Sequence, residues 1–284
     1  MSSFMRFGIS THLYHDHRLE RDHLAQVASY GFESVEVFAT RSHFDYRDDA
    51  AVDRLGEWLA DTGLRLHGVH APITETFGAG DVWAPGFSNA VQDQARREAA
   101  VRETEAALQI VRRIPFDVLV VHLGTPATKN NPGDNARSAA LRSAQEICRL
   151  AEPLGVRVAL EVIPNPLSDA ASLVRMLEDD IEARHAGICL DFGHAHLMGD
   201  VVDAIETTAE HLITTHVHDN RGRDDEHLVP FLGSIDWNMG LMAMQKIGYD
   251  GTYLMELANR ESPAKVLEEA RRARQQFERA LGQR

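Results

Sequence analysis

VRVALEV, residues 156–162, is a short run of aliphatic residues that carries a carboxylate at Glu161. The segment before it, 134–154, is typical of a helix and stops ahead of Gly155, a residue that often follows helix ends. A carboxylate inside an apolar run is costly to bury unless it is paired or bound to a metal ion. The stretch therefore predicts a buried strand that follows a helix and presents a functional group near its end.

The same pattern recurs along the whole chain. Seven further runs predict strands, at 6–10, 34–38, 64–70, 116–122, 185–192, 211–218 and 251–257. Helical spacing predicts helices at 20–30, 49–62, 93–112 and 262–281, in addition to 134–154. Strands rich in Val, Ile and Leu that alternate with helices are typical of a parallel sheet buried on both faces. Eight such units without a linker predict an α/β fold, a (β/α)8 TIM barrel that forms one domain over residues 1–284.

Two other segments bear on the choice of fold. RFGISTHLYHDH, which begins with the first predicted strand, contains no Gly-rich phosphate turn, and this argues against a dinucleotide-binding sheet. The stretch 71–92 is rich in Gly and Pro and is predicted to be irregular. A loop of that length in a compact domain usually has a function. Trp83 lies within it and is a candidate to stack on a ring of the substrate.

Composition limits the class of protein. The chain has 284 residues, 44% of them hydrophobic, and a formal net charge of −14. This charge argues against a broad nucleic-acid surface, and no apolar stretch approaches the ~18–20 residues that a membrane span needs. The first residues lack the features of a secretory signal. Cys148 and Cys189 do not form a disulfide framework, so we expect a reducing, cytoplasmic setting.

Side chains able to bind a metal stand at the downstream ends of the predicted strands. Four of them come from strands five to eight: Glu161, Asp191, His216 and Glu256. In a parallel barrel these ends meet at one pole, which carries the active site. Three carboxylates and one imidazole are a ligand set suited to Mn²⁺, Mg²⁺ or Co²⁺, and one that tolerates Zn²⁺. The sequence therefore predicts a divalent metal site.

A second set of polar residues occupies equivalent places. Strands three and four end at His70 and His122, and His194 follows Asp191 by three residues; His218, Asp225 and His227 come at or after the seventh strand. These residues are candidates for additional metal ligands, substrate contacts or acid–base groups. Gly193 is expected to allow a tight turn between Asp191 and His194. Glu36 is a candidate carboxylate of the barrel interior, whereas His15, His17, His23 and His43 are interpreted as surface residues.

The ordered motifs resemble a known superfamily. They are HAP at 70–72, HLG at 122–124, LEVIPNP at 160–166, CLDFGHAHL at 189–197, HVHDN at 216–220 and DDEHLVPFLGSIDW at 224–237. Together they look like the xylose-isomerase-like barrels, which include sugar isomerases and epimerases as well as endonuclease IV. The resemblance implies a metal site at Glu161, Asp191, His216 and Glu256. It favours His216 over His218 as the ligand, because the family's histidine stands three residues before an acidic residue, here Asp219.

The two branches of the superfamily imply different chemistry. Ketose 3-epimerases place a second catalytic glutamate six residues beyond the strand-five ligand, where this chain has Leu167. The three-zinc site of endonuclease IV maps onto residues of matching type throughout, namely His70, His122, Glu161, Asp191, His194, His216, Asp225, His227 and Glu256. Against that branch, the loop 219–233 is short and the segment 71–92 has no lysine or arginine, which a DNA-opening enzyme would use.

The resulting hypothesis is a metal-dependent isomerase or epimerase of a sugar or sugar phosphate. Glu161, Glu256 or His194 would move a proton next to a metal-polarised carbonyl. His12, Trp83, Arg221 and Arg223 are the expected substrate contacts. The alternative is a zinc-dependent, endonuclease IV-like phosphoesterase that acts on abasic DNA, and a third possibility is a sugar-binding barrel without catalysis. The expected partner is a small sugar; barrels often form homo-oligomers, but the sequence identifies no interface.

Overall fold

The computed structural model of the chain describes residues 5–78, 82–127 and 133–282, with the side chains of 77, 78 and 82–85 outside this description. Eight parallel strands close into a barrel in the order β1-β10-β9-β8-β7-β6-β3-β2. Their bounds are β1 Arg6–Ser10, β2 Ser34–Phe38, β3 Arg65–His70, β6 Val118–Val121, β7 Arg157–Glu161, β8 Ala186–Asp191, β9 Leu212–Val217 and β10 Thr252–Met255. The predicted closed (β/α)8 barrel is confirmed.

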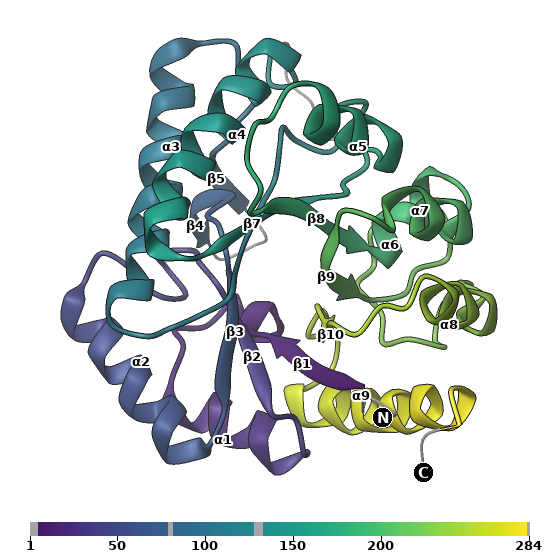
Figure 1. The fold of residues 1–284 in the computed structure, drawn as a ribbon. Coiled ribbons are helices and arrows are strands. Elements are labelled where there is room, and N and C mark those ends of the chain that lie inside the picture. Colours follow the sequence, from purple (N-terminus) through teal and green to yellow (C-terminus); the bar gives the residue numbers. More distant parts are fainter. Residues whose placement is uncertain (1–4, 79–81, 128–132, 283–284) are drawn as a thin grey trace.

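Helices surround the barrel, and at least one follows each barrel strand (Figure 1). They are α1 Arg21–Ser29, α2 Asp49–Thr62, α3 Gln94–Leu108, α4 Arg137–Ala151, α5 Ala170–Asp179, α6 Phe192–Met198, α7 Val201–Thr208, α8 Trp237–Lys246 and α9 Pro263–Ala280. The first and last elements pack together, since the rings of Phe7 in β1 and Phe277 in α9 are 6.1 Å apart. Within the described ranges, no helix is long and apolar enough to span a lipid bilayer.

The apolar residues divide into two layers because strand side chains alternate between two faces. One large cluster fills the space between the strands and the outer helices. A small cluster of Val118, Val120, Ala159 and Cys189 lies apart from it. Ala159 and Cys189 stand two residues before Glu161 and Asp191, so they share the inward face of their strands with these carboxylates. Below the carboxylates, the barrel interior therefore contains apolar side chains of β6, β7 and β8, together with Thr214 of β9, whose Oγ1 lies 3.0 Å from Nε2 of His67.

Register places two of the expected ligands directly beside each other and a third one step away. Asp191 of β8 is paired with His216 of β9, and Glu161 of β7 with Cys189 of β8. Because all eight strands run in parallel, their C-terminal ends meet at one pole of the barrel. We call this pole the mouth.

The expectation that 71–92 is irregular is wrong. The segment contains an antiparallel hairpin of β4 Thr74–Gly78 and β5 Val82–Gly86, with Thr76 paired to Ala84. Its prolines and glycines obscured the strand pattern, because Pro85 and Gly86 lie inside the second strand and are depleted in strands generally. Backbone hydrogen bonds between β4 and β5 stabilise the hairpin, although its residues have low strand preference.

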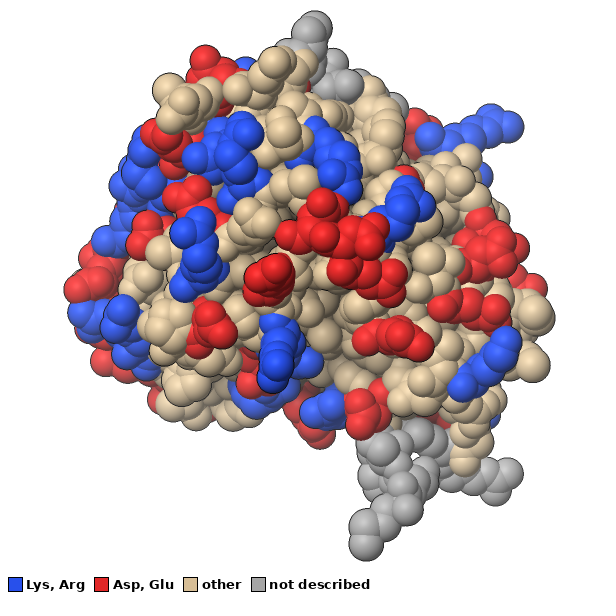
Figure 2. Space-filling view, turned by 45° about the horizontal axis from the view of Figure 1, so that its top comes forward, with Lys and Arg blue, Asp and Glu red and all other residues tan. Residues whose placement is uncertain are grey.

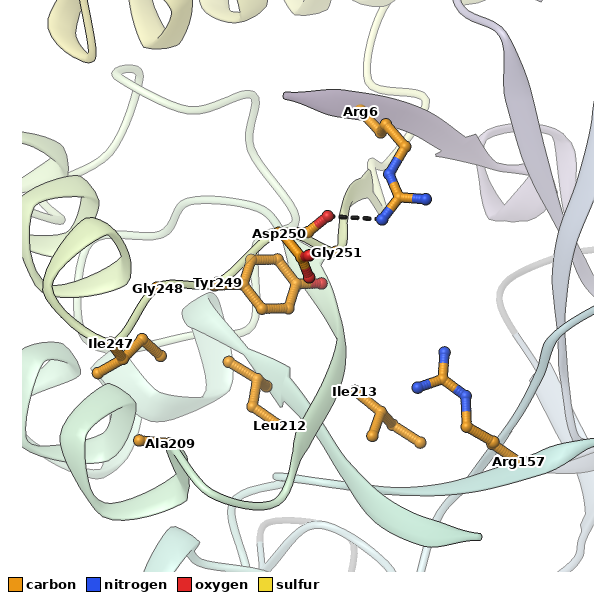
Figure 3. A pocket seen from close by; sticks show the side chains of 10 residues that line it. All are labelled: Arg6, Arg157, Ala209, Leu212, Ile213, Ile247, Gly248, Tyr249, Asp250 and Gly251. Atoms are coloured by element: carbon orange, nitrogen blue, oxygen red, sulfur yellow. Dashed lines mark hydrogen bonds between the residues drawn. The ribbon is translucent and has the colours of Figure 1, made fainter. Parts of the chain in front are cut away.

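A hollow of about 200 Å³ lies at the opposite pole, between the starts of β1, β7 and β9 and the connection from α8 to β10 (Figure 3). Arg6 and Arg157 border it, and Arg6 donates to the backbone oxygen of Asp250 at 2.5 Å. Its lining residues are at the beginnings of strands, so it is separate from the mouth.

His43 is fully buried, and its assignment to the surface is therefore wrong. Its Nδ1 lies 2.6 Å from the carbonyl oxygen of His17, and its Nε2 lies 3.1 Å from Oγ1 of Thr11. Burial lowers the pKa of His43 to about 4, since the charged ring would lose its hydration. The residue follows β2, and its local sequence contains no apolar periodicity that would have shown its burial.

This buried imidazole predicts a loss of stability in acid. The unfolded chain binds a proton at His43 below pH 6.5, whereas the folded protein binds it only near pH 4, so stability is lost as pH falls between these values. The full contribution is about 3 kcal/mol. Urea unfolding at pH 7 to 4 should show a shallower pH dependence for His43→Gln than for the unaltered protein. His17→Gln, at an exposed position, is the control; equal slopes for all three proteins would contradict the prediction.

Candidate metal centre and active site

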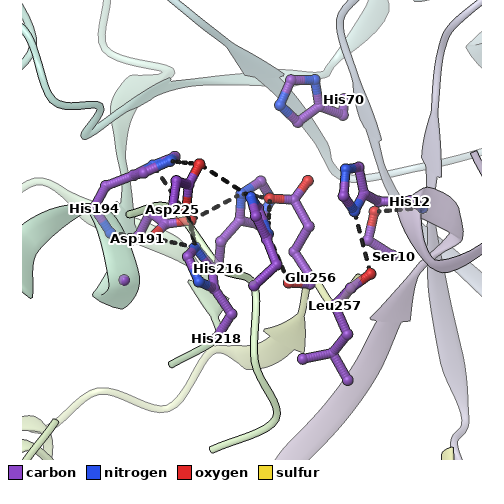
Figure 4. Close-up of polar contacts among 12 residues, drawn as sticks. Ser10, His12, His70, Asp191, His194, His216, His218, Asp225, Glu256 and Leu257 are labelled. Carbon is purple, nitrogen blue, oxygen red and sulfur yellow. Dashed lines mark hydrogen bonds and ion pairs between the residues drawn. The ribbon is translucent and has the colours of Figure 1, made fainter. Parts of the chain in front are cut away.

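Four side chains from consecutive strands converge at the mouth. Glu161, Asp191, His216 and Glu256 each offer a ligand atom, and these atoms all lie within 4.8 Å of one another. Nδ1 of His216 is 3.3 Å from Oε1 of Glu161, 3.6 Å from Oε2 of Glu256 and 3.9 Å from Oδ2 of Asp191. All four residues are buried. The structure thus brings together the four residues that the sequence singled out as ligands, and we call this set the central group. Figure 4 shows three of its members, Asp191, His216 and Glu256.

Two atoms of the central group are buried without a hydrogen-bond partner, Oε1 of Glu161 and Nδ1 of His216. Buried polar atoms of native proteins are nearly always hydrogen-bonded, and exceptions need an explanation such as an ion. Three carboxylates this close to one another would also repel. A divalent cation among them satisfies the orphan atoms and balances the charge, so the residues present fit a metal site.

Glu161 is the most enclosed of the carboxylates. Its Oε2 is 2.9 Å from Nε2 of His122 and 3.2 Å from Nε2 of His70, and its Oε1 is 3.4 Å from Nδ1 of His194. Burial alone would raise the pKa of Glu161, but His122 and His216 lower it well below its usual range. With His70 and His122 it forms a second ligand group. Glu161 therefore stays ionised and connects two possible ion positions.

A third group lies beside Asp191 and comprises His194, His218, Asp225 and His227. Oδ2 of Asp225 is 3.1 Å from Nε2 of His194 and 3.2 Å from Nε2 of His227. His218 is fully buried, stacks on His227 at a centroid distance of 4.0 Å, and its Nε2 is 3.0 Å from Asp191. His218 is thus a member of this third ligand group, and its role as an additional ligand or a substrate contact stays a prediction.

Backbone carbonyls orient several of these imidazoles. His70, His194 and His227 each place Nδ1 next to a carbonyl oxygen, at 2.8 Å from Ala71, 3.1 Å from Val162 and 3.0 Å from Glu256 respectively. A carbonyl only accepts, so Nδ1 of each ring carries a hydrogen. Nε2 faces a carboxylate of the site, Glu161 for His70 and Asp225 for His194 and His227, and is the nitrogen that would bind an ion once its own hydrogen is displaced. Metal-binding histidines are typically held by such outer hydrogen bonds.

Gly193 serves this arrangement in a way that the sequence did not indicate. A Cβ at this position would lie 2.0 Å from Cε1 of His218, so only glycine leaves room for the ring. Its φ is not positive, so the expected tight turn is not the reason for glycine here. Asp191 caps the following helix instead, by accepting from the backbone N–H of His194 at 2.7 Å.

Asp219 holds the loop that follows β9. It is fully buried and accepts five hydrogen bonds, from Nε1 of Trp237 at 2.8 Å and from the backbone N–H groups of Asn220, Phe231, Gly233 and Ile235. The loop carries Asp225 and His227, and His227 adopts a left-handed φ of 45°. Non-glycine residues rarely adopt this conformation unless their surroundings enforce it. Asp219 is thus the anchor of the third ligand group.

The expected substrate contacts lie in different environments. His12 is at the mouth, where its ring stacks on His227 at 4.9 Å and its Nδ1 lies 3.2 Å from the carbonyl oxygen of Leu257. Arg221 is paired with Glu226 at 2.5 Å, and Arg223 is exposed. The side chain of Trp83 lies outside the described residues.

Glu36 is a site residue that the sequence indicated only as a barrel-interior carboxylate. Its Oε2 is 3.2 Å from Nε2 of His216, on the ring edge opposite the central group. The signal in the sequence was a charged residue inside the apolar strand SVEVF. Its partner could not be found from the sequence, because 180 positions separate the two residues.

Comparison with known proteins gives the family context. A family model described as xylose isomerase-like TIM barrel matches residues 24–277. An uncharacterized protein of Methanocaldococcus jannaschii is 27% identical over 262 residues, which cover 90% of this chain and 84% of the relative. D-psicose 3-epimerase of Agrobacterium fabrum is 26% identical over 243 residues, covering 82% and 78% of the two chains. The curated relatives therefore include enzymes that epimerise sugars.

Solved structures share the fold over nearly the whole chain. A D-tagatose 3-epimerase-like protein superposes with a TM-score of 0.78 at 24% identity, covering 98% of this chain and 97% of the other. The IOLI protein, whose structure contains a zinc atom, has a TM-score of 0.78 at 15% identity, covering 96% and 98%. At these identities the likeness establishes the fold.

Proposed function

The chain belongs to the xylose isomerase-like TIM barrel family, and we propose that it is a metal-dependent isomerase or epimerase of a sugar or sugar phosphate. The observation that carries the proposal is the central group, four buried ligand atoms within 4.8 Å of one another, with Oε1 of Glu161 and Nδ1 of His216 left unpartnered. The psicose epimerase relative and the zinc in the IOLI protein support it.

Glu161, Asp191, His216 and Glu256 would hold the ion, and their mostly oxygen ligand set suits Mn²⁺, Mg²⁺, Co²⁺ or Zn²⁺. When bound, such an ion polarises the carbonyl of an open-chain hydroxy-carbonyl compound and so acidifies the neighbouring C–H group. The remaining chemistry is a proton transfer at that carbon, for which the chain must supply a base and a site that excludes bulk water.

Glu256 is the better placed of the two glutamates to move the proton. The imidazoles around Glu161 hold its pKa well below the usual range, and a carboxylate of very low pKa is a weak base. The side chain of Glu256 is 4% exposed, and its Oε2 lies 3.6 Å from Nδ1 of His216 and 3.7 Å from Nδ1 of His227. We assign Glu161 to holding the ion, Glu256 to proton transfer, and His194 to the relay of a proton through water.

His12 is proposed to bind a hydroxyl group of the substrate. Burial lowers the pKa of His12 well below its usual value, so the ring is neutral. Its Nδ1 hydrogen is directed to Leu257, which leaves Nε2 as an acceptor. A neutral acceptor at the mouth suits a sugar hydroxyl. Arg221 and Arg223 remain candidates for a substrate phosphate, although Arg221 would have to leave Glu226 first.

A second candidate function is supported by the two further ligand groups. His70 and His122 extend the central group on one side, and His194, His218, Asp225 and His227 lie on the other. A site for several zinc ions of this kind would suit an endonuclease IV-like phosphoesterase acting on abasic DNA. The net charge of −14 and the interspersed basic and acidic side chains in Figure 2 give less support to a DNA-binding surface.

Metal content and activity together test the proposal. We expect purified protein to contain about one divalent ion per chain by elemental analysis, and to interconvert at least one of D-fructose, D-psicose and D-tagatose or their phosphates after loading with Mn²⁺ or Co²⁺. Removal of the ion by a chelator should abolish turnover, and its return should restore it. About three zinc ions per chain with nicking of an abasic duplex would establish the second candidate instead. A protein that binds no divalent ion would overturn both.

The cellular setting is also a proposal. Cys148 and Cys189 are both buried and unpaired, which is consistent with a reducing compartment. We therefore place the reaction in the cytoplasm, on a small-molecule sugar.

A further inference from the structure

Glu36 lies inside the barrel next to a residue of the central group. It belongs to β2, is 1% exposed, and its Oε2 is 3.2 Å from Nε2 of His216 in β9. β1 and β10 separate these two strands in the closed sheet, so the side chains meet across the barrel interior. In β3, the pairing with β2 skips one residue between Val35 and Glu36, and such irregularities re-aim side chains near functional sites.

This contact determines which nitrogen of His216 can bind an ion. An ionised carboxylate only accepts hydrogen bonds, so Nε2 of His216 carries a hydrogen, and in the neutral ring that an ion would bind, Nδ1 keeps the lone pair. Nδ1 is the atom that faces Glu161, Asp191 and Glu256, and it has no hydrogen-bond partner. The contact with Glu36 therefore selects the tautomer in which the free lone pair is directed at the central group.

His216 differs in this from its neighbours at the mouth. His70, His194 and His227 place Nδ1 at backbone carbonyls and direct Nε2 to the site. In His216 the two nitrogens exchange these roles, because Nε2 contacts the protein and Nδ1 faces the site. The contact of Nε2 is a charged carboxylate, that of Glu36, and not a neutral carbonyl. A carboxylate accepts the hydrogen bond from Nε2 more strongly than a carbonyl does. This raises the basicity of Nδ1 and makes it a stronger metal ligand.

A role in fold stability alone does not account for Glu36. Its Oε1 is buried and has no hydrogen-bond partner, so the side chain is only half satisfied. A buried charge with an unsatisfied oxygen costs stability relative to an apolar residue of the same size. Glu36 is thus unfavourable for stability, and its one hydrogen-bonded oxygen, Oε2, is directed at His216.

We infer that Glu36 is a positioning residue of the metal centre, which holds His216 in the Nε2–H tautomer and strengthens Nδ1 as the ligand. The inference rests on the proposed function, because it requires an ion in the central group. It assigns Glu36 no contact with the substrate. Its effect should be on metal affinity, and on turnover only through the fraction of protein that holds an ion.

The test compares Zn²⁺ binding by the unaltered protein, Glu36→Gln and Glu36→Ala, measured by competition with a chromophoric chelator. Loss of an outer carboxylate partner typically lowers metal affinity by about 10–100-fold, and we expect this for Glu36→Ala. Glu36→Gln keeps an acceptor but no charge, so its loss should be smaller. Glu103→Gln is the matched control. Glu103 is a buried glutamate of the outer helix layer, and it accepts hydrogen bonds from Tyr46 and Arg47.

A second readout reports on the tautomer itself. In the zinc-loaded, ¹⁵N-labelled protein, the Nε2 hydrogen of His216 should give a downfield, slowly exchanging signal that shifts upfield in Glu36→Gln. Folded Glu36→Gln and Glu36→Ala proteins with unaltered Zn²⁺ affinity would overturn the inference. If Glu36→Ala does not fold, an unaltered affinity and unshifted signal in Glu36→Gln would do so. Failure of the unaltered protein to bind Zn²⁺ would instead overturn the proposed function.

Discussion

Glu161→Gln should lose the bound ion and reduce turnover by a factor of at least about 10²–10⁴, because a metal ion contributes several kcal/mol of transition-state stabilisation. The reason is the position of Glu161. Its two oxygens face the imidazoles of His70, His122, His194 and His216, and it belongs both to the central group and to the group with His70 and His122. An amide removes the negative charge and turns an N–H donor toward one of these rings. Elemental analysis and chelator competition measure the affinity, which should fall by more than the roughly 10–100-fold expected for an outer partner.

Glu256 provides the contrast that separates ion binding from proton transfer. Glu256→Ala should also lose the ion, whereas Glu256→Gln keeps one ligand oxygen and should retain more of the affinity while losing turnover to a similar extent. Glu103→Gln again controls for removal of a buried carboxylate elsewhere. A Glu161→Gln protein that is folded by circular dichroism and retains its full metal content would refute the assignment of the central group.

Asp219→Asn should destabilise the protein by about 3–5 kcal/mol, because it turns a fully satisfied buried carboxylate into a group with one acceptor oxygen. At least two of the five donors on Asp219 would face the new amide hydrogens or lose their partner. Gly233 cannot adjust, since it packs so closely that a Cβ there would be 2.2 Å from Oδ1 of Asp219. Thermal unfolding should shift downward by roughly 10 °C.

The same substitution should also release the loop that carries Asp225 and His227. We expect Asp219→Asn to weaken binding of any second ion more than binding in the central group, which none of the loop's residues joins. Asp236→Asn is the matched control. Asp236 caps α8 at the end of the same loop, is exposed, and asparagine caps helices equally well. Similar melting temperatures for the two variants would contradict the role assigned to Asp219.

The barrel could be predicted from the sequence because its signals are local. Strands such as 156–162 and 251–257 are continuous apolar runs between helices, and their alternation with helices restricts the topology to very few choices. The hairpin β4–β5 could not be predicted in this way, since its second strand contains Pro85 and Gly86. His43 was misplaced for a related reason, because burial of a polar residue in a connection depends on what packs over it.

The central group could also be predicted from local signals in the sequence. In a parallel barrel, the position of a residue along its strand fixes the pole at which it lies, and Glu161, Asp191 and Glu256 each close a strand or follow it directly. The choice between His216 and His218 was different. Both side chains point inward, two residues apart, and only the strand register decides which one faces three carboxylates and which one packs under His227.

The sequence by itself determined the fold and the pole at which the candidate ligands gather, because both follow from the order and spacing of residues along single strands. The tertiary structure decided how these groups are paired. That Glu36 holds His216, that Asp219 anchors the loop of the third group, and that Glu161 is enclosed by four imidazoles are contacts between residues far apart in the chain. Such contacts depend on barrel closure and on side-chain packing, which no local pattern encodes.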